Sequence, residues 1–415
     1  MATPSELRRI NQRKILGALL RLGAASRADL AKTTRLSPPT AGHIADELLQ
    51  AGLLEEADPD AAPAAAGPAA PRMGRPGRIL RLDRSRPRIA AIHLGASRTQ
   101  AALLPVGIPD PDEWPLERPT PSSSRAWVRE LAAAARRLPA GRVEAVLLSV
   151  PGVVDERRGR VLFSPNLHWT EKESLEELVR PVWDAPVRIV QEIRALALGH
   201  LAVEPEGGDF LLVDFEDGVG GAAVVGGALF TGPMPLSGEL GHTPVLGNRR
   251  PCGCGSTGCM ETLASRPGLL ESFAADRRRG PRDWAALARD VEERGLRPWF
   301  TAALDAAAAA IAGAINVLGV RRVVITGCLT ELPPAAVEYL SHAVSRGSMW
   351  ARFGEVACAA APRRRMAGLV SAALDRLLIP GVDEATAAAA SSSIWKDPGP
   401  ADPDRPWPLK HVLEG

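Results

Sequence analysis

Gly-Glu-Leu-Gly-His at 238–242, followed by Cys-Gly-Cys-Gly-Ser-Thr-Gly-Cys-Met-Glu at 252–261, is the stretch that decides how this chain is interpreted. It holds three of the five cysteines of the 415-residue chain within eight positions. Zn²⁺ prefers four soft or borderline ligands in a tetrahedron, and three thiolates with one imidazole form a standard structural set. Glycines between the cysteines let the loop turn tightly enough for the ligands to converge. We therefore expect a structural zinc ion bound by His242, Cys252, Cys254 and Cys259.

This pattern resembles the signature of the ROK family, which contains repressors, open reading frames and sugar kinases. The resemblance extends over roughly 87–380 and implies a two-lobed, actin-like ATPase fold with a sugar cleft between the lobes. It also implies that Glu239, His242 and Glu261 contact the sugar, with His242 serving the metal as well. Independently of the resemblance, apolar strands alternate with helices from Arg88 onward, which predicts α/β layers.

Composition limits the class of protein. The chain has 46% hydrophobic residues but no run of 18 apolar residues, so we expect no membrane span. Its first residues lack the apolar segment of a secretion signal. Cysteines clustered at ligand spacing, without a disulfide framework, indicate a reducing cytoplasm. Residues 1–82 carry 12 Lys/Arg against 8 Asp/Glu, and this basic excess favours an anionic partner for the N-terminal part only.

Residues 8–56 are predicted to form three helices joined by short turns. Ser26 and Asp29 have the spacing of a capping box that opens the second helix. Ser37 is expected to cap the third helix, with Pro38 and Pro39 in its first turn, where a missing N–H costs least. Two short helices joined by a three-residue turn form a helix-turn-helix, whose second helix enters the DNA major groove.

We therefore assign residues 1–82 to a winged helix-turn-helix DNA-binding domain, 87–380 to the ROK-like domain and 381–415 to a flexible tail.

The wing is predicted from a low-complexity stretch at 58–71 that leads through Gly-Arg-Pro-Gly at 74–77 into the strand-like 79–82. An arginine on a locally extended backbone suits insertion into the minor groove. Together the helices and the wing resemble the DNA-binding domain of ROK-family repressors. The predicted DNA-contacting residues are Arg27, Arg35, Ser37, Pro38, Pro39, Thr40, His43, Arg75 and Arg78.

The segments expected to meet nucleotide depart from the kinases of the family. The kinases begin with Asp-x-Gly-Gly-Thr, whereas residues 93–97 are His-Leu-Gly-Ala-Ser, and their Gly-Thr-Gly-x-Gly loop is replaced by Glu-Asp-Gly-Val-Gly at 216–220. The adenosine-side loop has Thr-Gly-Cys at 326–328 where a pair of glycines is usual, and Gln191-Glu192 replaces Asn-Asp. Carboxylates beside phosphates repel them. We therefore predict that the protein is not an enzyme and that Glu192 marks a vestigial base position.

The segments expected to bind sugar match the family's pattern better than the segments expected to bind nucleotide. The loop 164–169 resembles the family's sugar-contacting loop and supplies an asparagine amide. The predicted sugar-binding residues are Asn166, Gln191, Glu192, Glu239, His242 and Glu261. We expect a sugar-responsive regulator, most simply a repressor of carbohydrate uptake or catabolism genes, that binds operator DNA as a homodimer or homotetramer. A sugar kinase with an appended DNA-binding head, and a constitutive regulator with a vestigial cleft, remain alternatives. The Pro-rich stretch 106–124 is expected to be a loop.

Overall fold

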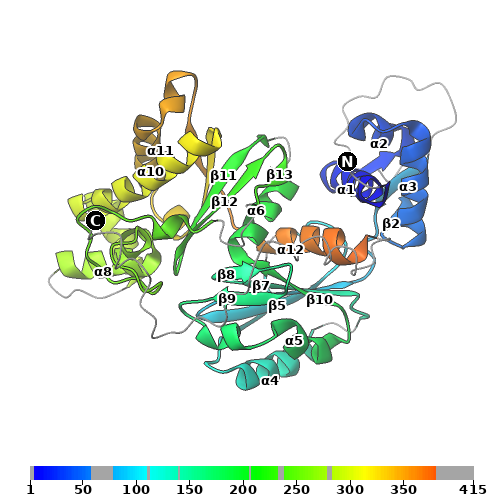
Figure 1. The fold of residues 1–415 in the computed structure, drawn as a ribbon, viewed down its shortest axis with the longest axis horizontal. Coiled ribbons are helices and arrows are strands. Elements are labelled where there is room, and N and C mark those ends of the chain that lie inside the picture. Colours follow the sequence, from blue (N-terminus) through cyan, green and yellow to red (C-terminus); the bar gives the residue numbers. More distant parts are fainter. Residues whose placement is uncertain are drawn as a thin grey trace, which may run out of the picture. The chain divides into compact units, whose positions relative to one another are not determined.

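The computed structural model describes residues 4–57, 78–109, 113–138, 141–204, 207–231, 238–277 and 283–379. Three helices and a three-stranded antiparallel sheet, ordered β1-β3-β2, form the N-terminal part, which we call the head (Figure 1). The predicted wing tip with Arg75, and the expected tail at 381–415, lie outside the described residues. The elements of the head are α1 (Pro4–Leu22), β1 (Ala24–Ser26), α2 (Arg27–Thr34), α3 (Pro38–Gln50), β2 (Leu54–Ala57) and β3 (Ile79–Leu82).

Side-chain caps fix the two short helices of the head, as their sequence predicts. Ser26 Oγ accepts a hydrogen bond from the Asp29 N–H at 3.1 Å, and the Asp29 carboxylate accepts one from the Ser26 N–H, which completes the capping box. The C-cap of α2 is Arg35, in the left-handed conformation at φ 56°. Ser37 Oγ then accepts from the Thr40 N–H at 3.3 Å and caps α3. α1 begins at Pro4, earlier than residue 8, where the predicted helices begin.

The first lobe of the body is built on a five-stranded sheet of order β10-β7-β4-β5-β6, in which β4, β7 and β10 run parallel. Figure 1 shows α4 and α5 on one face of this sheet, while α12 (Arg365–Ala373) lies against β4 and β7 on the other. The Pro-rich stretch expected as a loop contains an edge strand, β6, where proline is tolerated. The elements are β4 (Ile89–Leu94), β5 (Arg98–Leu104), β6 (Leu116–Pro119), α4 (Ser124–Ala135), β7 (Ala145–Val150), β8 (Val153–Asp155), β9 (Arg160–Phe163), η2 (His168–Lys172), α5 (Leu175–Trp183), β10 (Val187–Gln191) and α6 (Glu192–Val203).

The second lobe is built on a five-stranded sheet of order β13-β12-β11-β14-β15. α10 is long and apolar enough to cross a membrane by length and composition, but its Phe300, Leu304 and Ile311 are fully buried in the lobe's core. The elements are β11 (Phe210–Phe215), β12 (Val219–Val225), β13 (Ala228–Leu229), η4 (Leu240–His242), α7 (Glu261–Ala264), α8 (Arg266–Asp276), α9 (Trp284–Arg294), α10 (Pro298–Leu318), β14 (Arg322–Gly327), η5 (Cys328–Glu331), α11 (Ala335–Gly347), η6 (Met349–Arg352) and β15 (Ala357–Ala360).

The last described α-helix joins the first lobe to the head. α12 (Arg365–Ala373) packs against α6, and buried apolar residues of α12 share one continuous cluster with α1 of the head. The sequence predicts a single helix over 366–378, but the chain changes at Leu374 to a π-helical turn, η7 (Leu374–Leu378). Such turns carry one more residue than an α-helical turn and occur often at functional sites.

Candidate functional site

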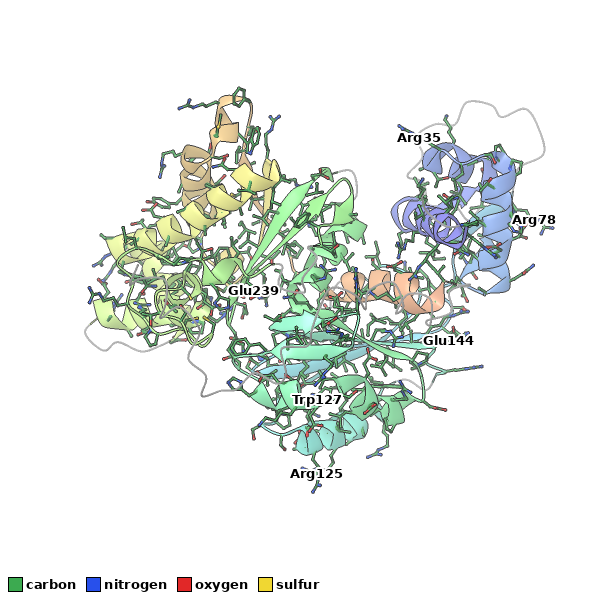
Figure 2. The ribbon with its side chains drawn as sticks, in the orientation of Figure 1. Arg35, Arg78, Arg125, Trp127, Glu144 and Glu239 are labelled. Atoms are coloured by element: carbon green, nitrogen blue, oxygen red, sulfur yellow. The ribbon has the colours of Figure 1, made fainter. Side chains whose placement is uncertain are left out.

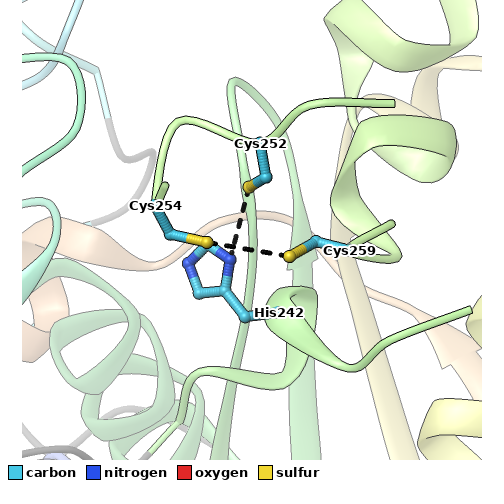
Figure 3. Close-up of side chains that lie close together, drawn as sticks. All are labelled: His242, Cys252, Cys254 and Cys259. Carbon is cyan, nitrogen blue, oxygen red and sulfur yellow. Dashed lines mark hydrogen bonds between the residues drawn. The ribbon is translucent and has the colours of Figure 1, made fainter. Parts of the chain in front are cut away.

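The four predicted metal ligands converge. Their donor atoms all lie within 4.8 Å of one another, and their side chains point toward a common centre (Figure 3). Cys252 Sγ lies 3.6 Å from His242 Nδ1, and Cys254 Sγ lies 3.7 Å from Cys259 Sγ. Tetrahedral bonds of about 2.0–2.3 Å to zinc place ligand atoms roughly 3.3–3.8 Å apart. The donor set and its spacing therefore fit a zinc ion; we call these residues the metal cluster.

Two glycines explain how the loops reach this geometry. A Cβ on Gly241 would lie 2.2 Å from the Val219 carbonyl oxygen, so glycine lets η4 lie directly on β12 and aim His242 at the cysteines. Gly258 has φ 88°, and a Cβ there would lie 2.7 Å from the Asn248 carbonyl oxygen. Only glycine adopts such a conformation without steric cost.

The metal cluster touches the predicted sugar site directly. Cys252 Sγ lies 3.1 Å from Glu261 Oε1, and His242 Nε2 lies 3.6 Å from Glu239 Oε2. A metal-bound histidine usually directs its second nitrogen at a carboxylate or carbonyl, which fixes the ring. Burial raises the pKa of Glu239, an effect that His242 opposes. The two glutamates are thus oriented by the loop that holds the metal ligands.

A cleft of about 1040 Å³ brings together every predicted sugar-binding residue. Within the cleft, the Gln191 side chain joins two segments of the chain. Its Nε2 donates one hydrogen bond to the Gly152 carbonyl at 3.0 Å and another to Glu239 Oε1 at 3.2 Å. Amide and carboxylate groups of this kind match the paired donors and acceptors of sugar hydroxyls. The lining residues from the prediction are Asn166, Gln191, Glu192, Glu239, His242 and Glu261.

The cleft is also lined by arginine–carboxylate ion pairs that were not predicted from the sequence. Arg363 makes two hydrogen bonds of 2.8 Å to the Asp214 carboxylate and one of 3.0 Å to Glu216. Arg266 pairs with Glu216 at 2.9 Å and with Glu331 at 2.7 Å. The only signal in the sequence was the run of three arginines at 363–365. We call this group, together with the Arg365–Glu192 pair, the ion-pair network.

His93 and Glu192 form an unusual pair at the centre of the cleft, with Nε2 and Oε1 3.6 Å apart. Burial, reinforced by Arg365, lowers the pKa of His93 to about 3. Burial alone would raise the pKa of Glu192, but His93, Arg365 and Arg363 outweigh it and hold that pKa at about 2. At neutral pH His93 is uncharged, so the two arginines hold the carboxylate ionised. A carboxylate held in this way is a poor proton acceptor.

This environment predicts acid sensitivity. The unfolded chain protonates His93 near pH 6.5, whereas the folded chain does so only near pH 3, so stability falls as pH drops below 6.5. Between pH 6.5 and 5, wild type should lose about 2 kcal/mol more unfolding free energy than His93→Asn. Urea unfolding at each pH measures this. His168→Gln, which alters a largely exposed histidine, should keep the wild-type slope; an equal slope for His93→Asn would contradict the prediction.

The predicted DNA-contacting residues that the structure describes lie on or beside α2, α3 and the start of β3. Figure 2 shows Arg35 and Arg78 pointing outward from the head. Ser37, Pro38, Pro39 and His43 are exposed, and Thr40 is partly exposed with its hydroxyl 2.7 Å from Ser37 Oγ. Arg27 pairs with Asp46 and Glu56, and Arg78 also contacts Glu56. His43 lies 2.9 Å from Glu47.

Known proteins resemble the chain over part or most of its length. It is 24% identical over 376 residues to a xylose repressor of Caldicellulosiruptor bescii, covering 85% of this chain and 92% of that one. It is 32% identical over 186 residues to an N-acetylmannosamine kinase of Escherichia fergusonii, covering 43% of this chain and 62% of the kinase.

Solved structures share the fold. A ROK family transcriptional regulator, a homologue of the E. coli MLC protein, has a TM-score of 0.68 at 21% identity and covers 90% of this chain and 98% of its own. A Streptomyces griseus glucokinase with glucose and AMPPNP has a TM-score of 0.56 at 22% identity, covering 69% and 97%. The actin-like, two-lobed fold expected for the body is thereby confirmed. Residues 89–374 match the ROK family, and the chain therefore belongs to that family.

Proposed function

We propose that the protein is a sugar-responsive transcriptional repressor that binds operator DNA through its head. The observation that carries this proposal is a combination within one chain. The succession of α2, a short turn and α3 accompanies a cleft that is lined by the six predicted sugar-binding residues and also contains the ion-pair network. In this proposal the ion-pair network takes the place of a nucleotide site, so that the cleft would bind sugar without phosphorylating it.

In the head, residues 1–82 would act as a winged helix, with α3 in the major groove and the β2–β3 connection as the wing. Arg35 and Arg78 would contact phosphates and give salt-dependent affinity, as would Arg27 once it exchanges its carboxylate partners for DNA. Ser37, Pro38, Pro39, Thr40 and His43 form the start of α3 that would face the bases. Arg75 is proposed as the wing's minor-groove contact on sequence grounds alone.

In the body, residues 87–380 would bind the sugar and a structural zinc. The loop of the metal cluster places Cys252 beside Glu261, and His242 lies beside Glu239, which Gln191 binds from the other side. The assembly is proposed to be a cytoplasmic homodimer or homotetramer, because two-fold operators are matched by two-fold proteins. Relatives named as a xylose repressor and an N-acetylmannosamine kinase suggest the first sugars to test.

Binding of the purified protein to the DNA upstream of its own gene tests the proposal. Fluorescence anisotropy should give a salt-dependent affinity, and one of D-xylose, D-glucose or N-acetyl-D-mannosamine should change it. Failure to bind this duplex at any salt concentration would sink the proposed function. Binding with no response to any sugar, and no sugar raising the melting temperature, would favour a constitutive regulator with a vestigial cleft.

The kinase alternative is favoured by one observation, the carboxylate of Glu192 retained at the base position. We expect no ADP release above background with the same three sugars, because Glu216 and Asp217 stand where phosphates would bind and Arg363 is already paired. A coupled ADP assay measures this. Turnover that disappears in Glu192→Ala would establish a kinase instead.

A further inference from the structure

We propose that Glu156 transmits changes in the sugar pocket to the head. It is the central link of a chain of hydrogen bonds and ion pairs that runs from Glu239 in the cleft to α1. The inference rests on the proposed function, since it names how the sugar site would control the DNA-binding part. None of these links was visible in the sequence, because their partners lie up to 366 residues apart.

The pocket end of the chain is Gln191. Its side-chain amide donates to Glu239 Oε1 at 3.2 Å, while its backbone N–H donates to Glu156 Oε1 at 2.8 Å. Gln191 is also the N-cap of α6 and is almost fully buried. A carboxylate at a helix N-terminus is stabilised by the helix dipole and by the free N–H groups there. A sugar hydroxyl that draws the Glu239 carboxylate away from the Gln191 amide would therefore act on the N-cap residue of α6.

Glu156 joins three elements through its two carboxylate oxygens. Oε1 also accepts from Arg194 Nε at 3.0 Å, and Oε2 accepts from Arg376 Nη2 at 2.6 Å. The Glu156 side chain is only 12% exposed, so these charge-assisted bonds lie largely out of water. A buried carboxylate that loses one partner without replacement is costly, which makes the partners move together.

The head end of the chain is the π-helical turn η7. Next to Arg376, Asp375 accepts a hydrogen bond from Arg13 through its carboxylate and one from Arg9 through its backbone carbonyl. Arg9 and Arg13 belong to α1, whose Ile15 and Leu19 are fully buried in the core beneath α2 and α3. A shift of η7 would therefore move α1, and a packed core would carry the whole head with it.

This proposal predicts energetic coupling between two residues that do not contact each other. The Kd for the upstream duplex should be measured for wild type, Gln191→Ala, Asp375→Asn and the double variant. Independent sites give multiplicative effects, whereas linked sites do not. We expect the double variant to depart from the product of the single effects by about fivefold. In a Glu156→Gln background the same cycle should be multiplicative within about twofold.

A matched control separates the relay from a general structural role. Glu176→Gln breaks a similarly buried pair with Arg188, on the same strand as Gln191, and should leave the coupling at its wild-type value. Arg376→Gln cuts the link from the other side and replaces Glu156→Gln if that variant does not fold. A multiplicative wild-type cycle, or coupling that survives both Glu156→Gln and Arg376→Gln, would overturn the proposal.

The same cycle can be measured without DNA, from the hydrogen-exchange protection of the α1 amides. This readout distinguishes the two proposals. If wild type does not bind the duplex, the proposed function fails, but the exchange cycle still decides whether Gln191 and Asp375 are coupled through Glu156. If it binds and both cycles are multiplicative, the relay fails and the proposed function stands.

Discussion

Cys259→Ser is expected to lose the bound metal and to lower the free energy of unfolding by about 4 kcal/mol, the stabilisation given by a ligand at a thousandfold its Kd. Cys259 is 2% exposed and lies opposite Cys254, so its loss opens the tetrahedron and leaves buried ligands without a cation. Metal analysis of the purified protein should find about one zinc ion per wild-type chain and almost none in the variant. Calorimetry would give the change in stability.

The control for this variant is Cys358→Ser. Cys358 is partly buried in β15 and takes no part in the metal cluster, so that protein should retain its zinc. Cys259→Ser should also lose any sugar response, because the loop that places His242 beside Glu239 and Cys252 beside Glu261 loses its metal, while DNA binding without sugar persists. Equal zinc content in Cys259→Ser and wild type would contradict the assignment of the metal cluster.

Pro39→Glu is expected to weaken DNA binding on the order of a hundredfold. Pro39 is exposed in the first turn of α3. This N-terminal end of the helix is the part proposed to enter the major groove. A carboxylate in this first turn favours the helix through its dipole, so the fold should be kept or slightly stabilised. The same charge would face the bases and phosphates and repel them. Anisotropy titrations at several salt concentrations, with a thermal melt, separate the two effects.

Gln50→Glu places the same charge at the other end of α3, where the residue is exposed. This variant should bind DNA within a few-fold of wild type. If Gln50→Glu were impaired and Pro39→Glu were not, α3 would have to bind in the opposite orientation. If neither were impaired, α3 would not be the recognition helix.

Features that depend on short separations were predictable from the sequence. Ser26 with Asp29, and Ser37 with Thr40, cap their helices from three residues away, and the metal cluster combines close cysteines with one nearby histidine. These patterns have a local physical cause, so composition and spacing contain enough information to place them.

The contacts that shape the cleft were not predictable. Arg363 meets Asp214 across 149 residues, and Arg376 meets Glu156 across 220. The residues next to an arginine in the sequence do not identify a carboxylate partner that is so distant along the chain. The pairing depends on how the two sheets and α12 pack together. The π-helical turn at 374–378 was missed for a similar reason, since its apolar pattern continues that of α12.

Arg35 has a consequence for how this protein trades stability against activity. It holds a left-handed conformation at the end of α2, which costs a residue with a side chain roughly 1 kcal/mol and costs glycine little. A chain optimised only for folding would place glycine at this turn. The protein instead accepts a less stable turn and presents a guanidinium group beside the start of α3. Stability has been given up at a corner of the head where a positive charge would meet DNA.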